Sequence, residues 1–473
     1  MIHRRALLAA PALLPALLPP GAAAQTAPAV KQDDTVGAGL RRGVLIRWGD
    51  RVTFDAPPFD PNNLDADGAS AQFGWDARIA AQVIPPMAAD GVTRAILAIA
   101  HPTVEAAMAF PGGMDRPAVA AQMQGASLLN LEVQGGRWIV VDGGFQSRRL
   151  TASTLCRVSG PLADQVGSSV LGVLGVNGGA ATPWGSLLLA EGDPALWSSR
   201  LGGLDRRFQT GQGFGWLVEL DPLDPQSIPV KRTAIGRFGK ADAAAAQTRG
   251  GQAVVYVAER GAGGYLFRFV SAGPASGPDA LDNGTLSVAQ LQNARITWMP
   301  LPQGSAANPV DAARAAGAMA FDAPSGLSWD ARGNRLIFTG GFGVLTFTPD
   351  GGDPAAPGMA GNMINTQGLG AVQTATADAR GRLLIGTDTG GPVGTTAQTL
   401  WAVDAGGNAT MLYGAARAAG IGNAVMAPDG ATIFTVARRP GAEPGATFAR
   451  PSTRWPQFEP GIPPRSSLLS LAR

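Results

Sequence analysis

The sequence predicts an all-β protein built on the repeating strand pattern of a β-propeller. Two observations support this prediction. Glycine and proline account for 65 and 37 of the 473 residues, and this abundance disfavours long helices and favours short strands joined by many turns. The C-terminal half also repeats a unit of about 50 residues, a period typical of propeller blades that contain several strands each.

The repeated unit begins with a turn that contains an aspartate and a glycine. Three copies carry Asp330, Asp378 and Asp429, which are 48 and 51 residues apart, and a run of apolar or β-branched residues follows each. In two copies a second strand pattern follows, at Val344–Gly351 and Leu400–Gly406. An aspartate next to a glycine is typical of a hairpin turn, because glycine supplies the positive φ that the turn needs. The three aspartates are therefore predicted to shape turns and not to act in a site.

The first 24 residues have the features of a twin-arginine-type signal peptide, with an ordinary secretory signal as the alternative. Arg4 and Arg5 precede an apolar stretch of 13 residues, Ala6–Leu18, which is too short to span a bilayer. The small residues Ala22–Ala24 fit a cleavage site. Twin-arginine signals are typical of proteins that fold before export. We therefore expect a periplasmic or secreted protein with no membrane span after signal removal.

The rest of the chain divides into a short arm and one large domain. Residues 25–39 are expected to form an irregular arm, and residues 40–473 a single β-propeller domain. Less regular strand patterns lie at Trp216–Leu220, Ala253–Ala258, Tyr265–Val270 and Ile296–Pro300. Helical patterns are sparse, and the best candidates are Asp76–Val83 and Ala312–Met319.

Composition excludes several classes of function. The net charge is 37 − 35 = +2, and it falls to zero without the two leader arginines, so no nucleic-acid partner is expected. The single cysteine, Cys156, excludes four-cysteine zinc sites and is predicted to be a buried thiol. The histidines are His3, in the leader, and His101, so a metal site with several histidines is excluded.

Several short segments, in order along the chain, carry a family resemblance. They read Leu45–Asp50 (LIRWGD), Gln72–Trp75 (QFGW), Thr182–Gly185 (TPWG), Phe214–Pro222 (FGWLVELDP), Pro229–Ala234 (PVKRTA) and Pro464–Ser466 (PRS). With these segments the chain resembles the PhoX family of exported alkaline phosphatases. The resemblance covers nearly the whole of residues 40–473.

This resemblance implies both a fold and a chemistry. Residues 40–473 would form a single PhoX-like β-propeller, six-bladed, with extra loops and short helices. The family resemblance also implies hydrolysis of phosphomonoesters outside the cytoplasm, at a cluster of calcium and iron held by carboxylates and one cysteine. Carboxylates are the ligands that hard cations prefer, and clustered cations neutralise phosphate and activate an attacking oxygen.

The sequence departs from the family pattern at several positions that the resemblance assigns to metal ligands. The family cysteine falls on Asn177, and family glutamates are missing from His101–Thr103, Gly239–Ala241 and Ala323–Ser325. A family run of three acids reads Glu259–Ala262 (ERGA) here. Since each calcium ion needs about six to eight oxygens, we expect calcium at a reduced or altered site. Asn177 argues against iron.

Four carboxylates that follow predicted strands are the candidate metal ligands. They are Glu191, Asp193, Glu259 and Asp388. Loops at strand ends line the mouth of a propeller, so residues far apart in sequence can meet there. Each carboxylate has a simpler alternative: a solvated loop position for Glu191 and Asp193, a surface ion pair with Arg260 for Glu259, and a turn-capping role for Asp388.

Three further residues are candidate substrate ligands. Arg438 and Arg439 follow a predicted strand, and guanidinium groups bind phosphate through paired hydrogen bonds. The alternative is a solvated loop pair. His101 follows the apolar run Ala95–Ala100 and is the third candidate, with a buried, hydrogen-bonded ring as the alternative.

The sequence thus predicts an exported PhoX-like phosphatase that hydrolyses small phosphorylated molecules at a reduced or altered metal site. An alternative is a catalytically inactive PhoX-like propeller that acts as a binding or scaffold module, so enzymatic activity stays open at this point. A third interpretation is a different propeller hydrolase or lactonase with one calcium ion at the axis. We expect a monomer.

Overall fold

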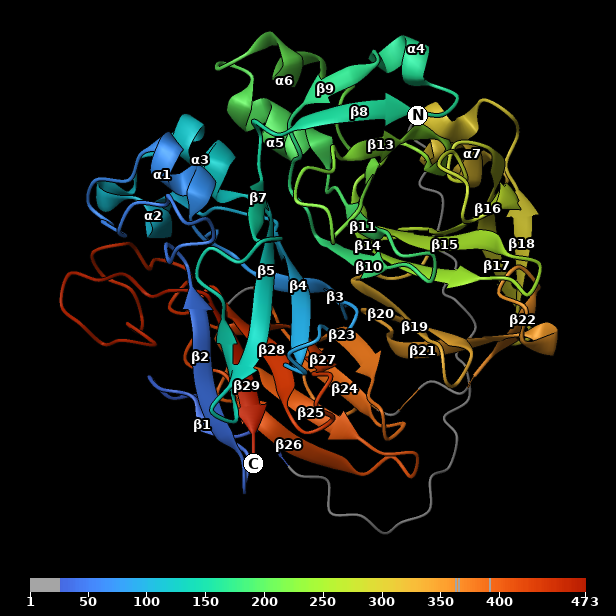
Figure 1. The fold of residues 1–473 in the computed structure, drawn as a ribbon. Coiled ribbons are helices and arrows are strands. Elements are labelled where there is room, and N and C mark those ends of the chain that lie inside the picture. The colour runs from blue at the N-terminus through green and yellow to red at the C-terminus, as the bar shows by residue number, and fades with distance from the viewer. Residues whose placement is uncertain (1–25, 362–363, 365, 391–392) are drawn as a thin grey trace, which may run out of the picture.

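The computed structural model describes residues 26–361, 364, 366–390 and 393–473, and most of the described secondary structure is β-strand (Figure 1). Groups of short antiparallel strands radiate from a common axis. This arrangement confirms the all-β, β-propeller class that the sequence predicts. The predicted signal peptide, residues 1–24, lies outside the described residues.

Five sheets contain the strands of the described residues. The first contains β3 (Arg78–Val83), β4 (Arg94–His101), β5 (Gly125–Gln134), β6 (Arg137–Val140) and β7 (Arg148–Leu150), which pairs with β5. The second runs in the order β10 (Gly178–Ala181), β11 (Leu187–Ala190), β12 (Leu217–Leu220), β13 (Val230–Arg232), β8 (Leu155–Ser159) and β9 (Ser169–Leu171). The pairing of β13 with β8 is parallel.

The third sheet has nine strands. Its order is β14 (Lys240–Gln247), β15 (Gln252–Glu259), β16 (Leu266–Pro274), β17 (Gly284–Gln292), β18 (Arg295–Pro300), β22 (Gly358–Ala360), β21 (Gly343–Pro349), β20 (Arg335–Gly340) and β19 (Gly326–Asp330). The fourth contains β23 (Val372–Ala377), β24 (Leu383–Thr387), β25 (Thr399–Val403), β26 (Ala409–Gly414) and β1 (Thr35–Val36). The fifth contains β27 (Gly420–Met426), β28 (Ile433–Arg438), β29 (Ser467–Ala472) and β2 (Arg41–Arg47).

The innermost strands close a ring around the axis. Strand β3 packs on β10, β10 on β14, β14 on β19, β19 on β23, β23 on β27, and β27 again on β3. Strand β22 pairs with both β18 and β21 and so joins two strand groups into one sheet. The number of blades therefore stays a prediction, whereas the closed ring is a feature of the structure.

The first long strand and the last strand of the described chain pair in one sheet. Strand β2, near the N-terminus, pairs with β29, at the C-terminus, and Ile46 faces Leu468 in the register (Figure 1). Leu468 and Leu469 are fully buried on opposite faces of β29 and belong to two different hydrophobic clusters. The last strand of the chain thus completes the sheet that the first long strand begins.

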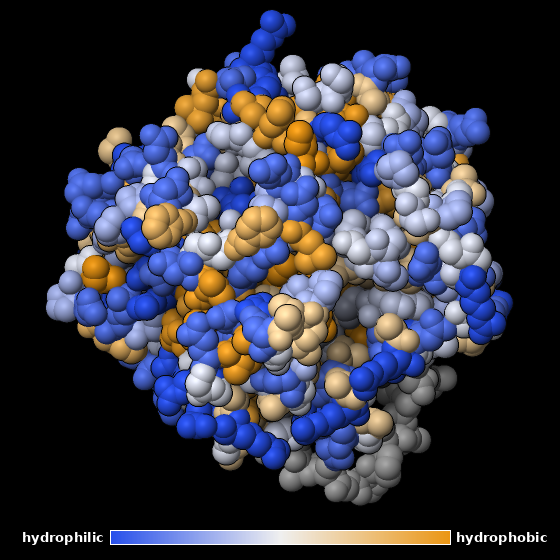
Figure 2. All heavy atoms as spheres, in the orientation of Figure 1, coloured by the Kyte–Doolittle hydropathy of each residue, from blue (hydrophilic) through white to orange (hydrophobic). Residues whose placement is uncertain are grey.

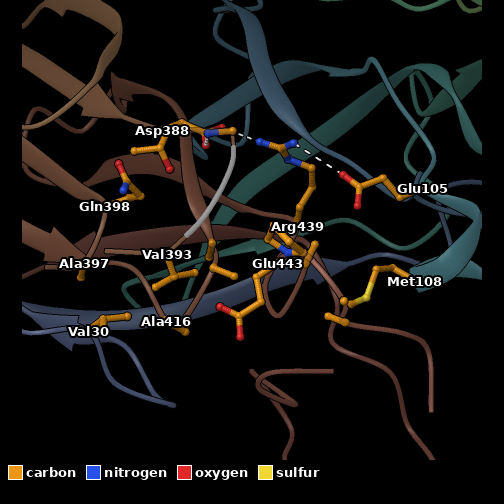
Figure 3. Close-up of a pocket in the computed structure, with 18 of the residues that line it drawn as sticks. Val30, Glu105, Met108, Asp388, Val393, Ala397, Gln398, Ala416, Arg439 and Glu443 are labelled. Carbon is orange, nitrogen blue, oxygen red and sulfur yellow. Dashed lines mark hydrogen bonds and ion pairs between the residues drawn. The ribbon is translucent and has the colours of Figure 1, made fainter. Parts of the chain in front are cut away.

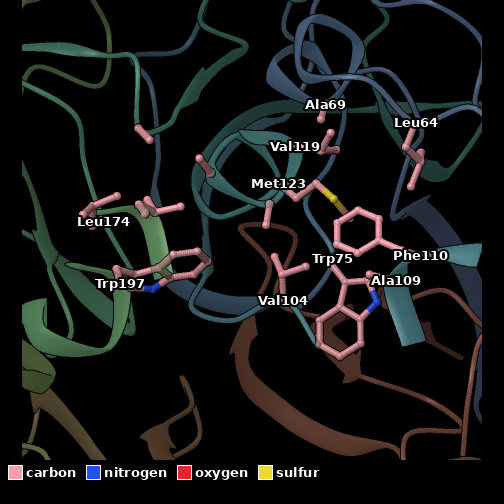
Figure 4. Packing of buried hydrophobic residues seen from close by; sticks show 14 of the residues in the cluster. Leu64, Ala69, Trp75, Val104, Ala109, Phe110, Val119, Met123, Leu174 and Trp197 are labelled. Atoms are coloured by element: carbon pink, nitrogen blue, oxygen red, sulfur yellow. The ribbon is translucent and has the colours of Figure 1, made fainter. Parts of the chain in front are cut away.

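Short helices lie outside the sheets. They are α1 (Ala66–Ala71), α2 (Ala106–Ala109), α3 (Pro117–Met123), α4 (Ala163–Val166), α5 (Pro194–Leu201), α6 (Arg206–Thr210) and α7 (Pro309–Ala315). Single 3₁₀ turns are η1 (Pro111–Gly113), η2 (Thr233–Ile235), η3 (Ser305–Ala307) and η4 (Asp350–Gly352). Trp75, Phe110, Met123 and Trp197 pack between α1, α2, α3 and α5 (Figure 4), and we call this group of helices the cap.

Most of the strands expected from the sequence are present. The patterns at residues 216–220, 253–258, 265–270 and 296–300 correspond to β12, β15, β16 and β18. Asp330, Asp378 and Asp429 each accept backbone N–H groups within their turns, which confirms their predicted structural role. The helix predicted at Ala312–Met319 overlaps α7.

The helix predicted at Asp76–Val83 is wrong, because this segment contains strand β3. Its alanines favour a helix in isolation, but Arg78–Val83 pairs with β4, with one irregularity between Ile79 and Ala81, and packs on β10 and β27 at the axis. Small side chains suit that crowded inner position, so tertiary packing overrides helix propensity.

Part of the expected arm pairs with the ring. Within residues 26–39, β1 pairs with β26, and the Gln32 carbonyl accepts a 2.6 Å hydrogen bond from Thr453 Oγ1. The face seen in Figure 2 carries mostly polar side chains with small apolar patches between them. Among the described residues, no helix has the length and apolar character needed to cross a bilayer.

Candidate functional site at the axial mouth

In each sheet, a second strand pairs with the innermost strand, and these second strands end at one face of the ring. In the registers, Arg78 faces Ala100, Gly178 faces Ala190, Lys240 faces Glu259, Val372 faces Thr387 and Gly420 faces Arg438. The inner strands therefore begin where their neighbours end. All seven sequence-predicted site residues lie at or just after these strand ends, and we call this end of the ring the axial mouth.

Arg438 is the centre of an ion-pair network at the mouth. Its Nε and Nη2 donate to the two carboxylate oxygens of Asp76 at 3.0 and 2.7 Å, and Nη1 donates to Asp388 Oδ2 at 3.0 Å. Burial opposes the charge of Arg438, but the two carboxylates outweigh it and raise its pKa. Arg438 thus stays charged and is held in one orientation by partners on two other sheets.

The carboxylates in this network are placed by the backbone. Asp388 Oδ1 accepts the Gly390 N–H at 2.8 Å, while a Cβ at Gly420 would lie 2.2 Å from the Asp388 carboxyl carbon. Only glycine therefore allows β27 to approach Asp388. Burial alone would raise the pKa of Asp76, but Arg438 and Arg439 outweigh it and hold the pKa below its usual value.

Arg439 reaches the same carboxylates from the next position. Its Nη2 donates to Asp388 Oδ2 at 2.8 Å, and its Nη1 lies 3.7 Å from Glu105 Oε1. The residue has a φ of 44°, in the left-handed region. Figure 3 shows Arg439 between Asp388 and Glu105 on the wall of a cavity of about 340 Å³, with Glu443 nearby.

A second ion pair lies at the axis itself. Arg78 Nη2 donates to Asp242 Oδ2 at 2.8 Å and to the Ser325 carbonyl at 2.9 Å. Asp242 also accepts the N–H groups of Gly179 and Leu327, so it contacts β10 and β19, the inner strands on either side of β14. Burial raises the pKa of Asp242 to about 6, although Arg78 and backbone N–H groups partly offset this effect.

Arg260 completes a group of three arginines around one cavity. Its Nη1 donates to Asn177 Oδ1 at 2.8 Å, and Asn177 donates in turn to the Lys240 carbonyl at 2.7 Å. The cavity has a volume of about 240 Å³, and Arg78, Arg260 and Arg438 contribute to its wall. Arg260 as a whole residue is exposed, but neighbouring atoms desolvate its guanidinium group, and this desolvation, followed by the charges of Arg438 and Arg78, lowers its pKa.

The structure does not bring the four predicted metal ligands together. Glu191 is fully buried, and its oxygens accept from Lys231 Nζ at 2.8 Å, from the Leu174 N–H at 2.9 Å and from the Trp216 N–H at 3.0 Å. Asp193 is exposed and caps α5 through the Ala195 N–H. Glu259 accepts the Tyr265 N–H at 3.2 Å, and burial raises its pKa.

The donor set therefore does not fit the metal cluster that the family resemblance implies. Within the described ranges, no group of three or more His, Cys, Asp or Glu side chains could hold a metal ion. Asp388 is the predicted ligand that faces the network, and arginines occupy its Oδ2. Cys156 is fully buried, as expected, and burial raises its pKa to about 11.

His101 does not face a substrate. The side chain is fully buried, Nδ1 lies 2.5 Å from the Asp76 carbonyl oxygen, and Nε2 lies 2.7 Å from Ser127 Oγ. Burial, followed by Arg149, lowers its pKa well below the usual value. The structure thus supports the alternative for His101, a buried ring that positions the Asp76 backbone.

Sequence reasoning missed Asp76, Arg78 and Asp242, and it placed Arg260 in a surface ion pair. Asp76, Arg78 and Asp242 lie just before or near the start of the inner strands β3 and β14, whereas the search followed the ends of the strands next to them. One signal was available: Asp242 stands in the otherwise apolar run Ala241–Ala246 (ADAAAA). A lone acid in a buried strand requires a partner, and Arg78 is that partner.

The fold places the chain in the class of β-propellers that includes a known phosphatase structure. Pseudomonas fluorescens PhoX in complex with vanadate, a transition state analogue, has 24% sequence identity, with 96% of this chain and 98% of that chain covered and a TM-score of 0.82. Residues 22–338 match the family described as Alkaline phosphatase PhoX. The chain belongs to this family.

Two other solved structures are much less similar. A gluconolactonase from Xanthomonas campestris has 12% identity, 88% and 97% coverage and a TM-score of 0.30. A protein of unknown function from Dyadobacter fermentans has 10% identity, 92% and 99% coverage and a TM-score of 0.40. No curated protein sequence matches the chain.

Proposed function

We propose that the protein is an exported phosphatase of the PhoX family that takes phosphomonoesters at the axial mouth. One observation carries this proposal: Arg78, Arg260 and Arg438 line the same cavity. Guanidinium groups hold phosphoryl oxygens through short, charge-assisted hydrogen bonds. The binding of vanadate, a transition state analogue, by Pseudomonas fluorescens PhoX supports the same class of substrate here.

The geometry supports charge stabilisation as the chemical role of these arginines. Arg438 is fixed by Asp76 and Asp388, and Arg78 is fixed by Asp242 and the Ser325 carbonyl. Donors that are fixed before the substrate arrives need not reorganise as negative charge develops on a transferred phosphoryl group. In this proposal the arginines bind and orient the phosphoryl group and stabilise its charge.

Calcium at a reduced or altered site stays a prediction. The carboxylates nearest the cavity already accept hydrogen bonds from arginine or backbone, so they offer few free oxygens to a cation. A protein that binds phosphomonoesters without turnover is the second candidate function, and this engagement of the carboxylates favours it. The interpretation as a single-calcium lactonase lacks support for the same reason.

An assay of the mature chain distinguishes the two candidates. We expect hydrolysis of an aryl phosphate, and we expect Arg260→Gln to lower kcat/KM at least tenfold, whereas Arg137→Gln, an exposed arginine on β6, leaves it unchanged. Phosphate binding without turnover would establish the second candidate. Hydrolysis that Arg260→Gln does not affect, or neither binding nor hydrolysis, would contradict the proposed site.

Elution as a monomer in size-exclusion chromatography would support the expected oligomeric state.

A further inference from the structure

The positions at which this chain departs from the family pattern meet at one place. Asn177, Arg260 and Ser325 lie in three separate departing segments, and all three line the cavity of about 240 Å³ at the axial mouth. Asn177, which stands at the family cysteine position, accepts the hydrogen bond from Arg260. The segments that depart from the family pattern thus contribute to one cavity wall, whose charged side chains are arginines.

The charged side chains in the wall of this cavity are arginines. Arg78, Arg260 and Arg438 line it, and no carboxylate is among its described lining residues. The acids Asp76 and Asp242 lie behind the guanidinium groups and hold them in place. Carboxylates behind the wall offset the charges of Arg78 and Arg438, whereas Arg260 has no carboxylate partner among the described contacts. A divalent cation in this cavity would meet guanidinium groups and no carboxylate ligand, whereas an oxyanion would meet guanidinium donors.

Arg78 also has a donor that the protein does not use. The side chain is only 7% exposed, and its buried Nε has no hydrogen-bond partner in the described structure. An unpaired buried donor of a charged group is costly, so a native structure usually supplies a partner. Since Arg78 lines the cavity, a bound acceptor could satisfy this donor.

We propose that this cavity binds the tetrahedral oxyanion of a phosphomonoester directly through guanidinium groups, without a divalent cation. The inference deepens the proposed function and rests on it, because it assigns the charge that a metal cluster would supply to Arg78, Arg260 and Arg438. Arg438 and Arg78 are fixed by carboxylates, and Arg260 is fixed by Asn177. The exposed Arg260 is placed to meet an anion that enters from solvent.

Titration calorimetry with inorganic phosphate tests this inference. The mature protein is dialysed against EDTA, shown to be free of metal by elemental analysis, and titrated with and without added calcium. We expect phosphate to bind with the same Kd, within about twofold, in both arms. Arg260→Gln should weaken binding about tenfold or more, since it removes a charge-assisted hydrogen bond to the anion. Arg260→Lys should recover part of the affinity, and Arg137→Gln should have no effect.

The outcomes separate this inference from the proposed function. Binding that appears only with calcium and is weakened by Arg260→Gln would overturn the metal-free site but leave the axial mouth as the phosphate site. Metal-free binding that Arg260→Gln leaves unchanged would place the anion elsewhere and overturn the inference. No binding in either arm would contradict both. Because Arg260 is exposed, its variants should fold, and circular dichroism checks this directly.

Discussion

At the scale of single residues, a carboxylate at a strand end can form a buried ion pair in the core and not face the axial mouth. Glu191 and Lys231 form a pair in which both side chains are fully buried. Lys231 Nζ also donates to the Gly213 carbonyl at 2.7 Å and lies 4.6 Å from the centre of the Phe214 ring. The position of Glu191 in the sequence indicated the correct end of the ring, and in the structure its carboxylate accepts from Lys231 and two backbone N–H groups, while a role as metal ligand stays a prediction.

We predict that Glu191→Gln destabilises the protein strongly. The change leaves the Lys231 charge buried without a carboxylate, and breaking such a pair typically costs about 3–5 kcal/mol. The double variant Glu191→Gln/Lys231→Met should be less destabilised than Glu191→Gln alone, because it leaves no unpaired charge. Urea unfolding of the four proteins in the double-mutant cycle measures this coupling. A stable Glu191→Gln protein that has lost bound calcium would instead support the predicted role as a metal ligand.

Asp242 should make stability depend on pH in a defined window. Its pKa is about 6 in the folded protein and 3.8 in the absence of perturbation, so between these values the folded chain holds more protons than the unfolded chain. The contribution of Asp242 to the free energy of unfolding therefore falls as pH rises from about 4 to about 6 and is constant above that range.

The variant Asp242→Asn tests this expectation, because it removes the titration. It leaves Arg78 without its carboxylate, which adds a penalty that does not depend on pH. The stability of the native protein relative to the variant should decrease as pH rises from about 4 to about 6, as measured by urea unfolding at each pH. A difference that stays constant across this range would contradict the raised pKa.

At the scale of elements, the sequence predicted strands that follow glycine-containing turns, but it did not predict the inner strands β3 and β14. Glycine-containing turns and alternating apolar residues located β15, β20 and β24, whose partners are close in sequence. The segments of β3 and β14 are rich in alanine, which carries a helical preference and no strand signal. Their strand conformation is imposed by neighbours on both sides of the ring, and this information is not local in the sequence.

The cap is an element whose stability can be tested separately from the ring. Trp197 of α5 is 6% exposed, lies in the cap cluster and donates from Nε1 to the Pro102 carbonyl at 3.3 Å. We predict that Trp197→Ala costs about 3–5 kcal/mol, since it leaves a large cavity. Hydrogen exchange should show lost protection in α3 and α5 before the strands. Leu196→Ala, at a side chain that is 66% exposed, is the matched control and should have little effect.

At the scale of the whole molecule, the candidate site exists only when the ring is closed. Arg438 comes from the last third of the chain, whereas its partner Asp76 comes from the first, and the two are 362 positions apart. The family resemblance predicted the ring, and the strand ends predicted Arg438, Arg439 and Asp388 at one mouth. The pairing of each arginine with a particular carboxylate follows from blade placement, and no local pattern in the sequence contains it.

Ring closure also connects folding to the proposed export route. Strand β29 pairs with both β2 and β28, and its Leu468 and Leu469 are fully buried, so the ring closes only after the C-terminus has been synthesised. If the signal peptide directs the chain to a twin-arginine route, export requires this closed fold.

We therefore predict that deletion of residues 467–473 prevents export of the chain with its own leader in a bacterial host. Arg4→Lys/Arg5→Lys should retain the full-length chain in the cytoplasm by disabling the leader itself. Pulse-chase labelling followed by cell fractionation measures both effects, and a general secretory leader on the truncated chain is the control, since that route carries unfolded chains. Equal export of the truncated and full-length chains with the native leader would show that the leader is read as an ordinary secretory signal.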